Sequence, residues 1–277
     1  MTKESAGHDY VLGTAESEQR RLVLQASILR GWTEKFFKSA GIAPGMRVLD
    51  VGCGMGDVAF LAAEMLGPSG QVIAIDRELG TIEKARARAA QIQSSARVQF
   101  EHADILDYAH SEKFDAVVGR YILLYQPDPV AAVRKLATLV RSGGLMVFHE
   151  IDFGDTPQAW PEAPLWNQSW KLIAEAFRRS GTPPDFGLRI ARTFVSAGLP
   201  WPKFHAEVPM VSGPDSYMYG WIAETLRSLI PRIEQYGLAR SDELQIDSLA
   251  SRLEAEAVSL GCQLAGPVQV GAWVTLA

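Results

Sequence analysis

The chain has 277 residues, 47% of them hydrophobic, and a formal net charge of -5. The length is enough for one large domain, or for one domain with a sizeable insertion, and the charge disfavours a nucleic-acid partner. Two distant cysteines offer no metal-ligand spacing, and the chain has neither a secretory core nor an apolar run of about 20 residues, so we predict a cytoplasmic protein without metal or membrane span.

The first half of the chain alternates between helical and strand-like patterns. Residues 16–40 carry apolar side chains at three- and four-residue steps, which predicts an amphipathic helix that Gly41 closes. A short apolar run at 46–51 predicts a buried strand, followed by a helix at 57–66 and a second strand at 71–76. Strand, helix and strand in this order form a βαβ unit.

The same alternation continues as far as residue 151. It predicts a helix at 81–93, strands at 98–103 and 114–119, a helix at 129–140 and a strand at 143–151. Because these strands are short, apolar and interleaved with helices, we predict an α/β fold whose parallel sheet is covered on both faces.

Beyond residue 152 the pattern is coarser. A proline-rich connector occupies 155–166 and overlaps the next predicted helix. The predicted elements that follow are helices at 164–180, 186–198, 214–236 and 241–260, and strands at 202–211 and 267–277.

The loop after the first strand is rich in glycine. Gly52, Gly54 and Gly56 alternate with other residues directly before the helix at 57–66. In a βαβ unit a ligand lies at the carboxyl end of the first strand, against the start of the helix, and a side chain at these positions would stand between ligand and backbone. A plain glycine turn is the alternative, but the acid Asp76 at the end of the second strand favours a ligand site.

A dinucleotide is the rival ligand. Gly54, Gly56 and Ala59 satisfy G-x-G-x-x-A, and Asp76 could hold a ribose diol. That register, however, places the strand end two residues later than the apolar run does. Asp57 would also repel a pyrophosphate at the helix start, so the acids around the loop favour a ligand that carries a positive group.

The stretch Asp50-Val-Gly52-Cys-Gly54-Met-Gly56 resembles the first motif of class I S-adenosylmethionine-dependent methyltransferases. The resemblance extends over about residues 45 to 152, and it is nearest to the subgroup of ubiquinone- and menaquinone-biosynthesis enzymes that act on small molecules. Ser142 departs from the family at a position that commonly holds proline. The resemblance implies a Rossmann-like, seven-stranded, mostly parallel sheet whose last strand is antiparallel, with helices on both faces and an added helical cap.

The resemblance also implies S-adenosyl-L-methionine as the cofactor. In this family Asp76 would hold the ribose hydroxyls, Asp104 would contact the adenine amine, and Ile105 would pack beside the ring. Residues 10–22 resemble a lid over the methionine half, and Arg120 borders the cleft. The predicted cofactor-binding residues are Tyr10, Gln25, Asp50, Gly52, Cys53, Gly54, Asp76, Arg77, Asp104, Ile105 and Arg120.

Methyl transfer is an in-line displacement, which needs alignment and exclusion of water in a lidded pocket more than acid–base machinery. A base is needed only if the acceptor arrives protonated. The catalytic candidates are His149 first, Glu150 beside it, and Tyr121 as a residue that orients the acceptor. The alternative for His149 is a histidine satisfied within the core.

We therefore divide the chain into a lid strip and helix (1–44), a cofactor-binding core (45–152), and remaining strands with a helical cap (153–277). Aromatic residues concentrated in the last part favour a small, apolar or aromatic acceptor. A monomer or a homodimer is expected. A nicotinamide-dependent oxidoreductase and a non-catalytic protein that binds S-adenosylmethionine remain as alternative functions.

Overall fold

The computed structural model describes residues 11–12, 16–92, 97–154 and 159–277. The chain divides into two compact units. The helical unit comprises residues 1–28, 151–186 and 207–268, and the core unit comprises 29–150, 187–206 and 269–277. Every residue of the candidate site described below, from the glycine loop to Glu150, belongs to the core unit.

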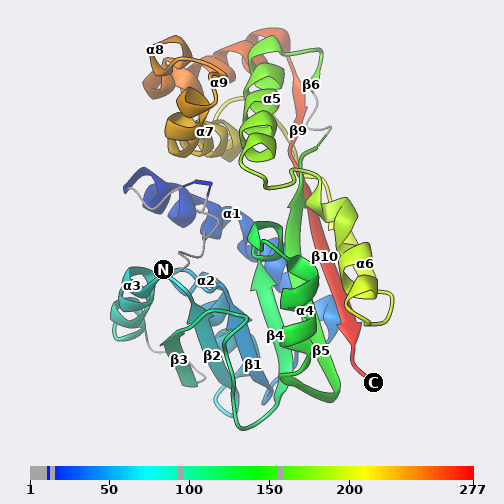
Figure 1. The fold of residues 1–277 in the computed structure, drawn as a ribbon. Helices are drawn as coiled ribbons and strands as arrows, with labels where there is room; N and C mark the ends of the chain where they lie inside the picture. Colours follow the sequence, from blue (N-terminus) through cyan, green and yellow to red (C-terminus); the bar gives the residue numbers. More distant parts are fainter. Residues whose placement is uncertain (1–10, 13–15, 93–96, 155–158) are drawn as a thin grey trace, which may run out of the picture. The chain divides into compact units, whose positions relative to one another are not determined.

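Helices and strands alternate through most of the core unit, whereas helices dominate the helical unit (Figure 1). The helices are α1 (Glu16–Ala40), α2 (Asp57–Leu66), α3 (Leu79–Ala89), η1 (Leu123–Tyr125), α4 (Pro129–Ala137), α5 (Pro164–Arg179), α6 (Phe186–Ser196), α7 (Tyr217–Gln235), α8 (Ser241–Leu244), η2 (Ile246–Ser248) and α9 (Leu249–Leu260). The strands are β1 (Arg47–Val51), β2 (Gln71–Asp76), β3 (Arg97–His102), β4 (Phe114–Arg120), β5 (Val140–Asp152), β6 (Ala159–Trp160), β7 (Lys203–Glu207), β8 (Met210–Ser212), β9 (Gln263–Ala265) and β10 (Val268–Thr275).

The core unit is built on a seven-stranded sheet with the order β3-β2-β1-β4-β5-β10-β7. Neighbouring strands from β3 to β5 are parallel. Strand β10 runs antiparallel to β5, because Gly143 near the start of β5 donates to the carbonyl of Leu276 beyond the end of β10, and Leu276 donates back to Gly144. The predicted mostly parallel sheet with an antiparallel last strand is therefore confirmed.

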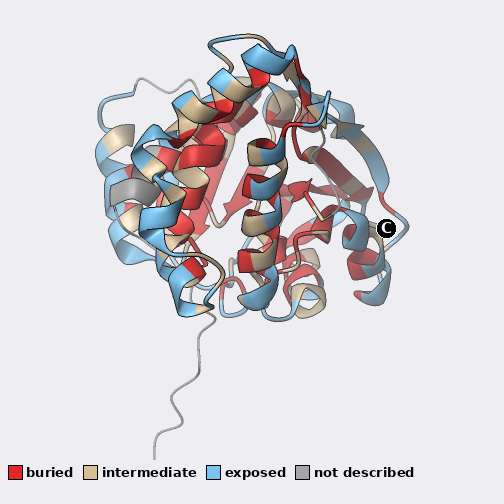
Figure 2. Cartoon of the chain, turned by 90° about the horizontal axis from the view of Figure 1, so that it is seen from above, coloured by how far each residue is buried: buried red, intermediate tan, exposed pale blue. Residues whose placement is uncertain are grey.

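Both faces of the sheet are covered by helices. One face packs Val48, Val118 and Val147 against Phe37 of α1 and the buried sides of α2 and α3. On the other face Phe148 of β5 contacts Phe194 of α6, with ring centroids 6.0 Å apart. Figure 2 shows the central strands of the sheet as buried, whereas the helices are buried on one side and exposed on the other.

Three predicted elements of the second half differ from the structure. The predicted strand at 202–211 is two strands in different sheets, since Pro209 between β7 and β8 has no N–H for a sheet ladder. The predicted helix at 241–260 is interrupted at Gln245, whose φ of 46° lies in the left-handed region. The predicted strand at 267–277 begins one residue later, as β10, and the preceding β9 was missed.

The helical unit contains a small sheet that the sequence pattern did not predict. Strands β6, β9 and β8 form it with antiparallel pairing. Helices α5, α7 and α9 pack together beside it, with an aromatic core in which the rings of Trp166, Trp170 and Trp221 lie about edge to face. None of the helices in the described part of the chain combines the length and the apolar character that crossing a bilayer requires.

Candidate functional site

The glycine loop joins the end of β1 to the start of α2 at the carboxyl edge of the sheet. Gly52 and Gly54 both have positive φ, of 64° and 53°. A Cβ on Gly52 would lie 2.3 Å from Cδ1 of Ile122, so the chain's own packing requires glycine there. A Cβ on Gly54 would meet nothing within 4 Å. Gly54 is therefore the position at which a ligand can approach the backbone most closely.

Asp76 ties this loop to the second βα turn. Its Oδ2 accepts a hydrogen bond from the Gly54 N–H at 2.8 Å, and its Oδ1 accepts one from the Glu78 N–H at 2.9 Å. An ionised carboxylate offers about four lone-pair positions, so two remain for hydroxyl donors. Asp76 thus lies beside the glycine loop, which is the position required of a residue that binds a ribose there.

Arg88 of α3 also holds the glycine loop, and the sequence analysis missed it. Its Nη1 donates to the carbonyl of Met55 at 2.5 Å, and its Nη2 donates to Oδ1 of Asp57 at 2.9 Å. The guanidinium lies over the ring of Phe60 at 5.4 Å. No spacing rule relates residue 88 to this loop, since the contact exists only after α3 has packed against the sheet.

Asp50, the last acid of β1 before the loop, is 1% exposed. Neither of its carboxyl oxygens has a hydrogen-bond partner among the described residues. Burial raises the pKa of Asp50 well above its usual value, while the positive charge of Arg120 and the nearby backbone N–H of Ala59 act in the opposite direction. A buried carboxyl group without a donor calls for an explanation, and a ligand that brings an N–H donor or a positive charge supplies one.

The predicted adenine-binding residues follow β3 at the same edge of the sheet. Asp104 is exposed, and its Oδ1 accepts a hydrogen bond from the Leu106 N–H at 2.8 Å. Ile105 is buried at 7% exposure. Asp76 pairs with His102 at the ends of β2 and β3, so Asp76 and Asp104 share this edge. Arg77 is exposed at the same turn and lies 3.7 Å from Glu78.

His149, the first candidate for a base, is fully buried and has both ring nitrogens in hydrogen-bond contact. Nδ1 lies 2.9 Å from Oγ1 of Thr33, and Nε2 lies 3.0 Å from Oε1 of Gln269. Burial and, to a smaller extent, the charge of Arg120 lower the pKa of His149 to about 3, although the hydrogen bond to Gln269 acts in the opposite direction. The ring is therefore neutral, and this geometry leaves no nitrogen free to remove a proton from an acceptor.

Tyr121 and Arg120 belong to the same set of contacts. The Tyr121 hydroxyl donates to Oε1 of Gln269 at 2.5 Å, and Nη1 of Arg120 donates to Oγ1 of Thr33 at 3.2 Å. Burial raises the pKa of Tyr121 and lowers that of Arg120. Thr33 and Gln269 were missed, and the only signal for Gln269 was a polar residue inside an apolar strand.

Glu150 supports the backbone that follows β4. Its Oε1 accepts hydrogen bonds from the N–H groups of Ile122 and Leu123, at 3.1 and 2.8 Å. Its Oε2 has no partner within the described ranges. Burial raises the pKa of Glu150 to about 8, although the backbone N–H bonds work in the opposite direction. The carboxyl group is thus held against residues 122 and 123.

The remaining predicted residues lie outside these contacts. Tyr10 falls outside the described residues. Gln25 belongs to the helical unit, where its Oε1 accepts a hydrogen bond from Nη1 of Arg21 at 2.5 Å. Cys53 is buried within the glycine loop, its N–H donates to the Ile75 carbonyl at 3.0 Å, and burial raises the pKa of its thiol.

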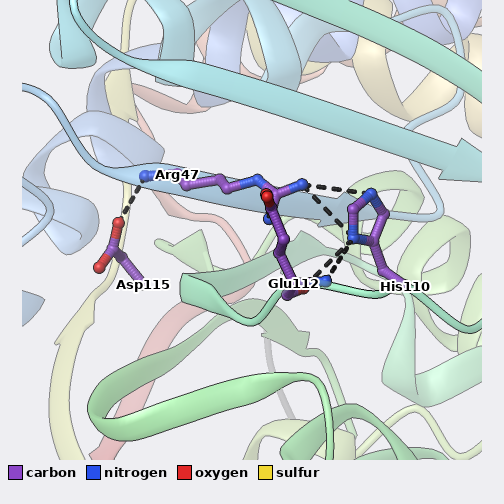
Figure 3. Close-up of polar contacts among 4 residues, drawn as sticks. All are labelled: Arg47, His110, Glu112 and Asp115. Carbon is purple, nitrogen blue, oxygen red and sulfur yellow. Dashed lines mark hydrogen bonds and ion pairs between the residues drawn. The ribbon is translucent and has the colours of Figure 1, made fainter.

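The opposite, amino-terminal ends of β1 and β4 carry a different polar cluster (Figure 3). The Arg47 N–H donates to Oδ2 of Asp115 at 2.7 Å, and the Arg47 guanidinium pairs with Oε2 of Glu112 at 2.6 Å and lies 3.2 Å from Nε2 of His110. Nε of Arg141 donates to Oδ1 of Asp115 at 2.7 Å. Burial acts to raise the pKa of Asp115, but the bonds from Arg47 and Arg141 outweigh it and lower that pKa.

An open parallel sheet with a bare glycine loop after β1, an acid at the end of β2 and an unpartnered acid beneath the loop defines an α/β domain that binds a small ligand at its carboxyl edge. A family model described as a methyltransferase domain matches residues 42–181, just over half of the chain. The chain belongs to this methyltransferase family. The prediction of an S-adenosylmethionine-dependent methyltransferase is therefore confirmed for the family, and the nicotinamide-dependent alternative is left without support.

Two curated relatives have names that concern quinones. A 2-phytyl-1,4-naphthoquinone methyltransferase from Synechococcus elongatus is 36% identical over 121 residues, which cover 43% of this chain and 52% of the relative. A demethylmenaquinone methyltransferase from Staphylococcus aureus is 28% identical over 142 residues, 51% of this chain and 55% of the relative. The chain thus spans about half the length of the curated relatives it matches.

Solved structures share the fold at low sequence identity. The YcgJ protein of Bacillus subtilis has a TM-score of 0.55 at 16% identity, covering 88% of this chain and 98% of that one. A phosphoethanolamine N-methyltransferase 2 of Haemonchus contortus, solved with S-adenosylhomocysteine, has a TM-score of 0.54 at 20% identity, covering 89% of this chain and 53% of that one. These similarities extend the fold assignment well beyond the part that the family model matches.

Proposed function

We propose that this chain transfers the methyl group of S-adenosylmethionine to a small quinone-type acceptor. The observation that carries the cofactor half of the proposal is Asp50, a fully buried acid with two unpartnered carboxyl oxygens beneath a glycine loop that is open at Gly54. A ligand with a positively charged amino-acid group would favour the ionised form of this buried acid and supply the N–H donors that it lacks.

Different site residues would contact different parts of the cofactor. Asp76 would accept the ribose hydroxyls with its remaining lone pairs, and Asp104 and Ile105 would hold the adenine. Gly52, Cys53 and Gly54, with Asp50 beneath them and Arg120 at the end of β4, would face the methionine half. When bound, S-adenosylmethionine supplies a methyl group on a positively charged sulfur. Tyr10, Gln25 and Arg77 remain proposed contacts from the resemblance alone.

The acceptor class rests on the relatives. Both curated relatives carry names of methyltransferases that act on naphthoquinone-type molecules. Because a methyl group on a sulfonium is an electrophile, the acceptor has to be electron-rich, so we propose the reduced, quinol form as the substrate. The predicted roles of residues 1–44 as a lid and of 153–277 as a cap belong to this proposal, as do the cytoplasmic location and the monomeric or dimeric state.

We propose no side-chain base for this reaction: as the methyl group bonds to the quinol, the electron pair of the broken S–C bond stays on S-adenosylhomocysteine, and the proton that the quinol loses goes to water. His149 has both nitrogens in hydrogen bonds, Tyr121 donates its only hydroxyl proton to Gln269, and Glu150 holds backbone N–H groups. These three residues are then positioning groups. The contribution of the chain is alignment of the reactants, which can lower a barrier by about 7–11 kcal/mol.

Calorimetric titration with S-adenosylhomocysteine and, in parallel, with NADH tests the cofactor. We expect micromolar binding of S-adenosylhomocysteine, none of NADH, and a loss of about 100-fold or more in affinity for Asp76→Ala. Asp107→Ala, which removes an exposed acid five residues beyond the end of β3, serves as the control and should bind as the wild type does. Binding of NADH, or of neither ligand, would refute the assignment.

Transfer of labelled methyl groups tests the acceptor. Purified protein with methyl-labelled S-adenosylmethionine would be offered a reduced 2-alkyl-1,4-naphthoquinone, the same quinone unreduced, and phosphoethanolamine. Label in the reduced quinone alone is the expected result. Label in phosphoethanolamine would overturn the quinone proposal while leaving the cofactor assignment in place.

A further inference from the structure

We propose that Gln269 of β10 is a positioning residue. Through Tyr121 and His149 it would hold in place the carboxyl edge of the sheet, where the cofactor is proposed to bind. The inference rests on the proposed function, because the edge it supports is the one assigned to the methionine half of the cofactor. Gln269 is 0% exposed and interrupts an otherwise apolar strand. A polar side chain at such a position is costly unless its hydrogen bonds are made.

The side-chain oxygen of Gln269 serves two partners at once. The Tyr121 hydroxyl lies 2.5 Å from Oε1, and Nε2 of His149 lies 3.0 Å from the same atom. An amide oxygen can only accept, so Tyr121 donates its O–H and His149 donates an Nε2–H. The rings of Tyr121 and His149 also contact each other, with centroids 5.4 Å apart.

This assignment decides the tautomer of His149. With its proton on Nε2, the neutral ring has a lone pair on Nδ1, which faces Oγ1 of Thr33 at 2.9 Å. Oγ1 in turn accepts a hydrogen bond from Arg120 at 3.2 Å. The single hydroxyl proton of Thr33 has two acceptors within reach, the Leu29 carbonyl at 3.0 Å and Nδ1 of His149, and the tautomer assigned here directs it to Nδ1. A continuous chain of donors and acceptors therefore runs from Arg120 through Thr33, His149 and Gln269 to Tyr121.

The chain of contacts continues from Tyr121 to the glycine loop. Tyr121 has a φ of 53°, in the left-handed region that is unfavourable for a residue with a side chain. Its backbone N–H donates to the His149 carbonyl at 2.8 Å, so both its backbone and its hydroxyl are fixed. The next residue, Ile122, fills the space beside Gly52 so closely that a Cβ on Gly52 could not fit. Gln269 thus acts on the loop through Tyr121 and Ile122.

The test measures the affinity for S-adenosylhomocysteine in a double-mutant cycle of Gln269→Leu and Tyr121→Phe. Each single variant leaves a buried polar group without its partner, so we expect roughly tenfold weaker binding for Gln269→Leu and less for Tyr121→Phe. Because both act through one contact, the double variant should bind no more weakly than Gln269→Leu. Gln99→Leu, on an exposed position of β3, is the matched control and should leave the affinity unchanged.

Nitrogen NMR of the wild-type protein gives a readout that does not need any variant to fold. We expect His149 to be neutral with its proton on Nε2. A proton on Nδ1 would mean that the Gln269 amide is turned around, and it would overturn the inference. Unchanged affinity in Gln269→Leu, or full additivity in the cycle, would overturn it too. If the wild type itself failed to bind S-adenosylhomocysteine, the proposed function would fail, and the NMR result would still decide the hydrogen-bond assignment.

Discussion

Charged side chains are partnered differently at the two ends of strands β1 and β4. At the amino ends, the Arg47 guanidinium pairs with Glu112 and the Arg47 backbone N–H donates to Asp115 (Figure 3). Asp115 also pairs with Arg141. At the carboxyl end of β1, Asp50 is buried and its carboxyl oxygens lack partners in the described part of the chain. The acid at the amino ends is therefore paired with charged and polar partners, whereas the acid at the carboxyl end of β1 is not.

The difference indicates which end was built for a ligand. Paired charges at the rim of a sheet hold neighbouring strands in register and need nothing further. A buried, unpartnered acid lowers the stability of the free protein, and such a group is retained where a ligand or a reaction uses it. The contrast leads to four predictions, in which changes at the carboxyl ends affect binding or its support and changes at the amino ends affect stability alone.

The largest effect on ligand affinity among these changes is expected for Gly54→Ala. We expect the affinity for S-adenosylhomocysteine to fall about 100-fold, or about 2.7 kcal/mol, because the added methyl group enters space that the chain leaves open. Gly45→Ala is the matched control, since Gly45 precedes β1 at the other end with a φ of 81°. Both variants should lose about 1–2 kcal/mol of stability from positive φ, but Gly45→Ala should bind normally. Equal affinity in the two variants would remove the distinction between the ends.

For Glu150→Gln we expect a change in how stability depends on pH. The pKa of Glu150 is raised from 4.5 to about 8 by burial, so the folded state keeps a proton that the unfolded chain releases between these values. The stabilisation from this group is complete below about pH 4.5 and is lost as the pH rises through about 8. Since one pKa unit corresponds to about 1.4 kcal/mol, we expect the wild type to lose a few kcal/mol relative to the variant over this range.

Urea unfolding of both proteins at about pH 5 and about pH 9 measures this difference. The other buried titratable groups nearby, such as His149 and Asp50, are common to both proteins, and the lowered pKa of His149 removes stability only as the pH falls from 6.5 towards about 3. A stability difference that stays constant with pH would show that Glu150 is ionised throughout, and the carboxyl end would then be less unusual than we infer.

Most of the core unit could be predicted from sequence, because its signals are local. The helices at 16–40 and 57–66 and the strand at 71–76 occur with the predicted bounds. Buried parallel strands and amphipathic helices differ in period, and glycine marks their junctions. The small sheet of β6, β9 and β8 was missed because two- and three-residue strands carry no period, and the helix predicted at 241–260 hid the left-handed turn at Gln245.

The sequence predicted those site residues whose role follows from their position at a strand end or in a loop. It did not predict the roles that depend on hydrogen-bond partners far away in the chain. Asp50, Gly54 and Asp76 follow from strand ends and a loop, and the structure places all three at the expected edge. The role of His149 depends on Thr33 and Gln269, which are 116 and 120 residues away in the chain. Because His149 is a histidine, the sequence suggested a base. Its contacts with Thr33 and Gln269 favour a positioning group instead, and no local sequence pattern predicts those contacts.

A further prediction concerns Arg47→Met at the amino end. The Arg47 side chain is 16% exposed and lies over the ring of Phe114, so methionine keeps much of the packing but loses the bonds to Glu112 and His110. We expect about 1 kcal/mol of lost stability and an unchanged affinity for S-adenosylhomocysteine. Calorimetry and urea unfolding on one preparation separate the two effects. A tenfold change in affinity would mean that the two ends of β1 are coupled.

The smallest effect is expected for Arg141→Met. Its guanidinium is about half exposed and pairs with Asp115 at 2.7 Å, and exposed pairs contribute about 0.2–1 kcal/mol that salt screens. Asp115 would still accept the Arg47 backbone N–H, so its carboxylate stays partnered after the change. We expect a loss within that range at low salt that vanishes at about 1 M salt, measured by thermal unfolding. A larger loss that does not change with salt would show that Arg141 is an essential partner of Asp115. The acid at the amino end would then be as poorly compensated by other groups as Asp50 is at the carboxyl end.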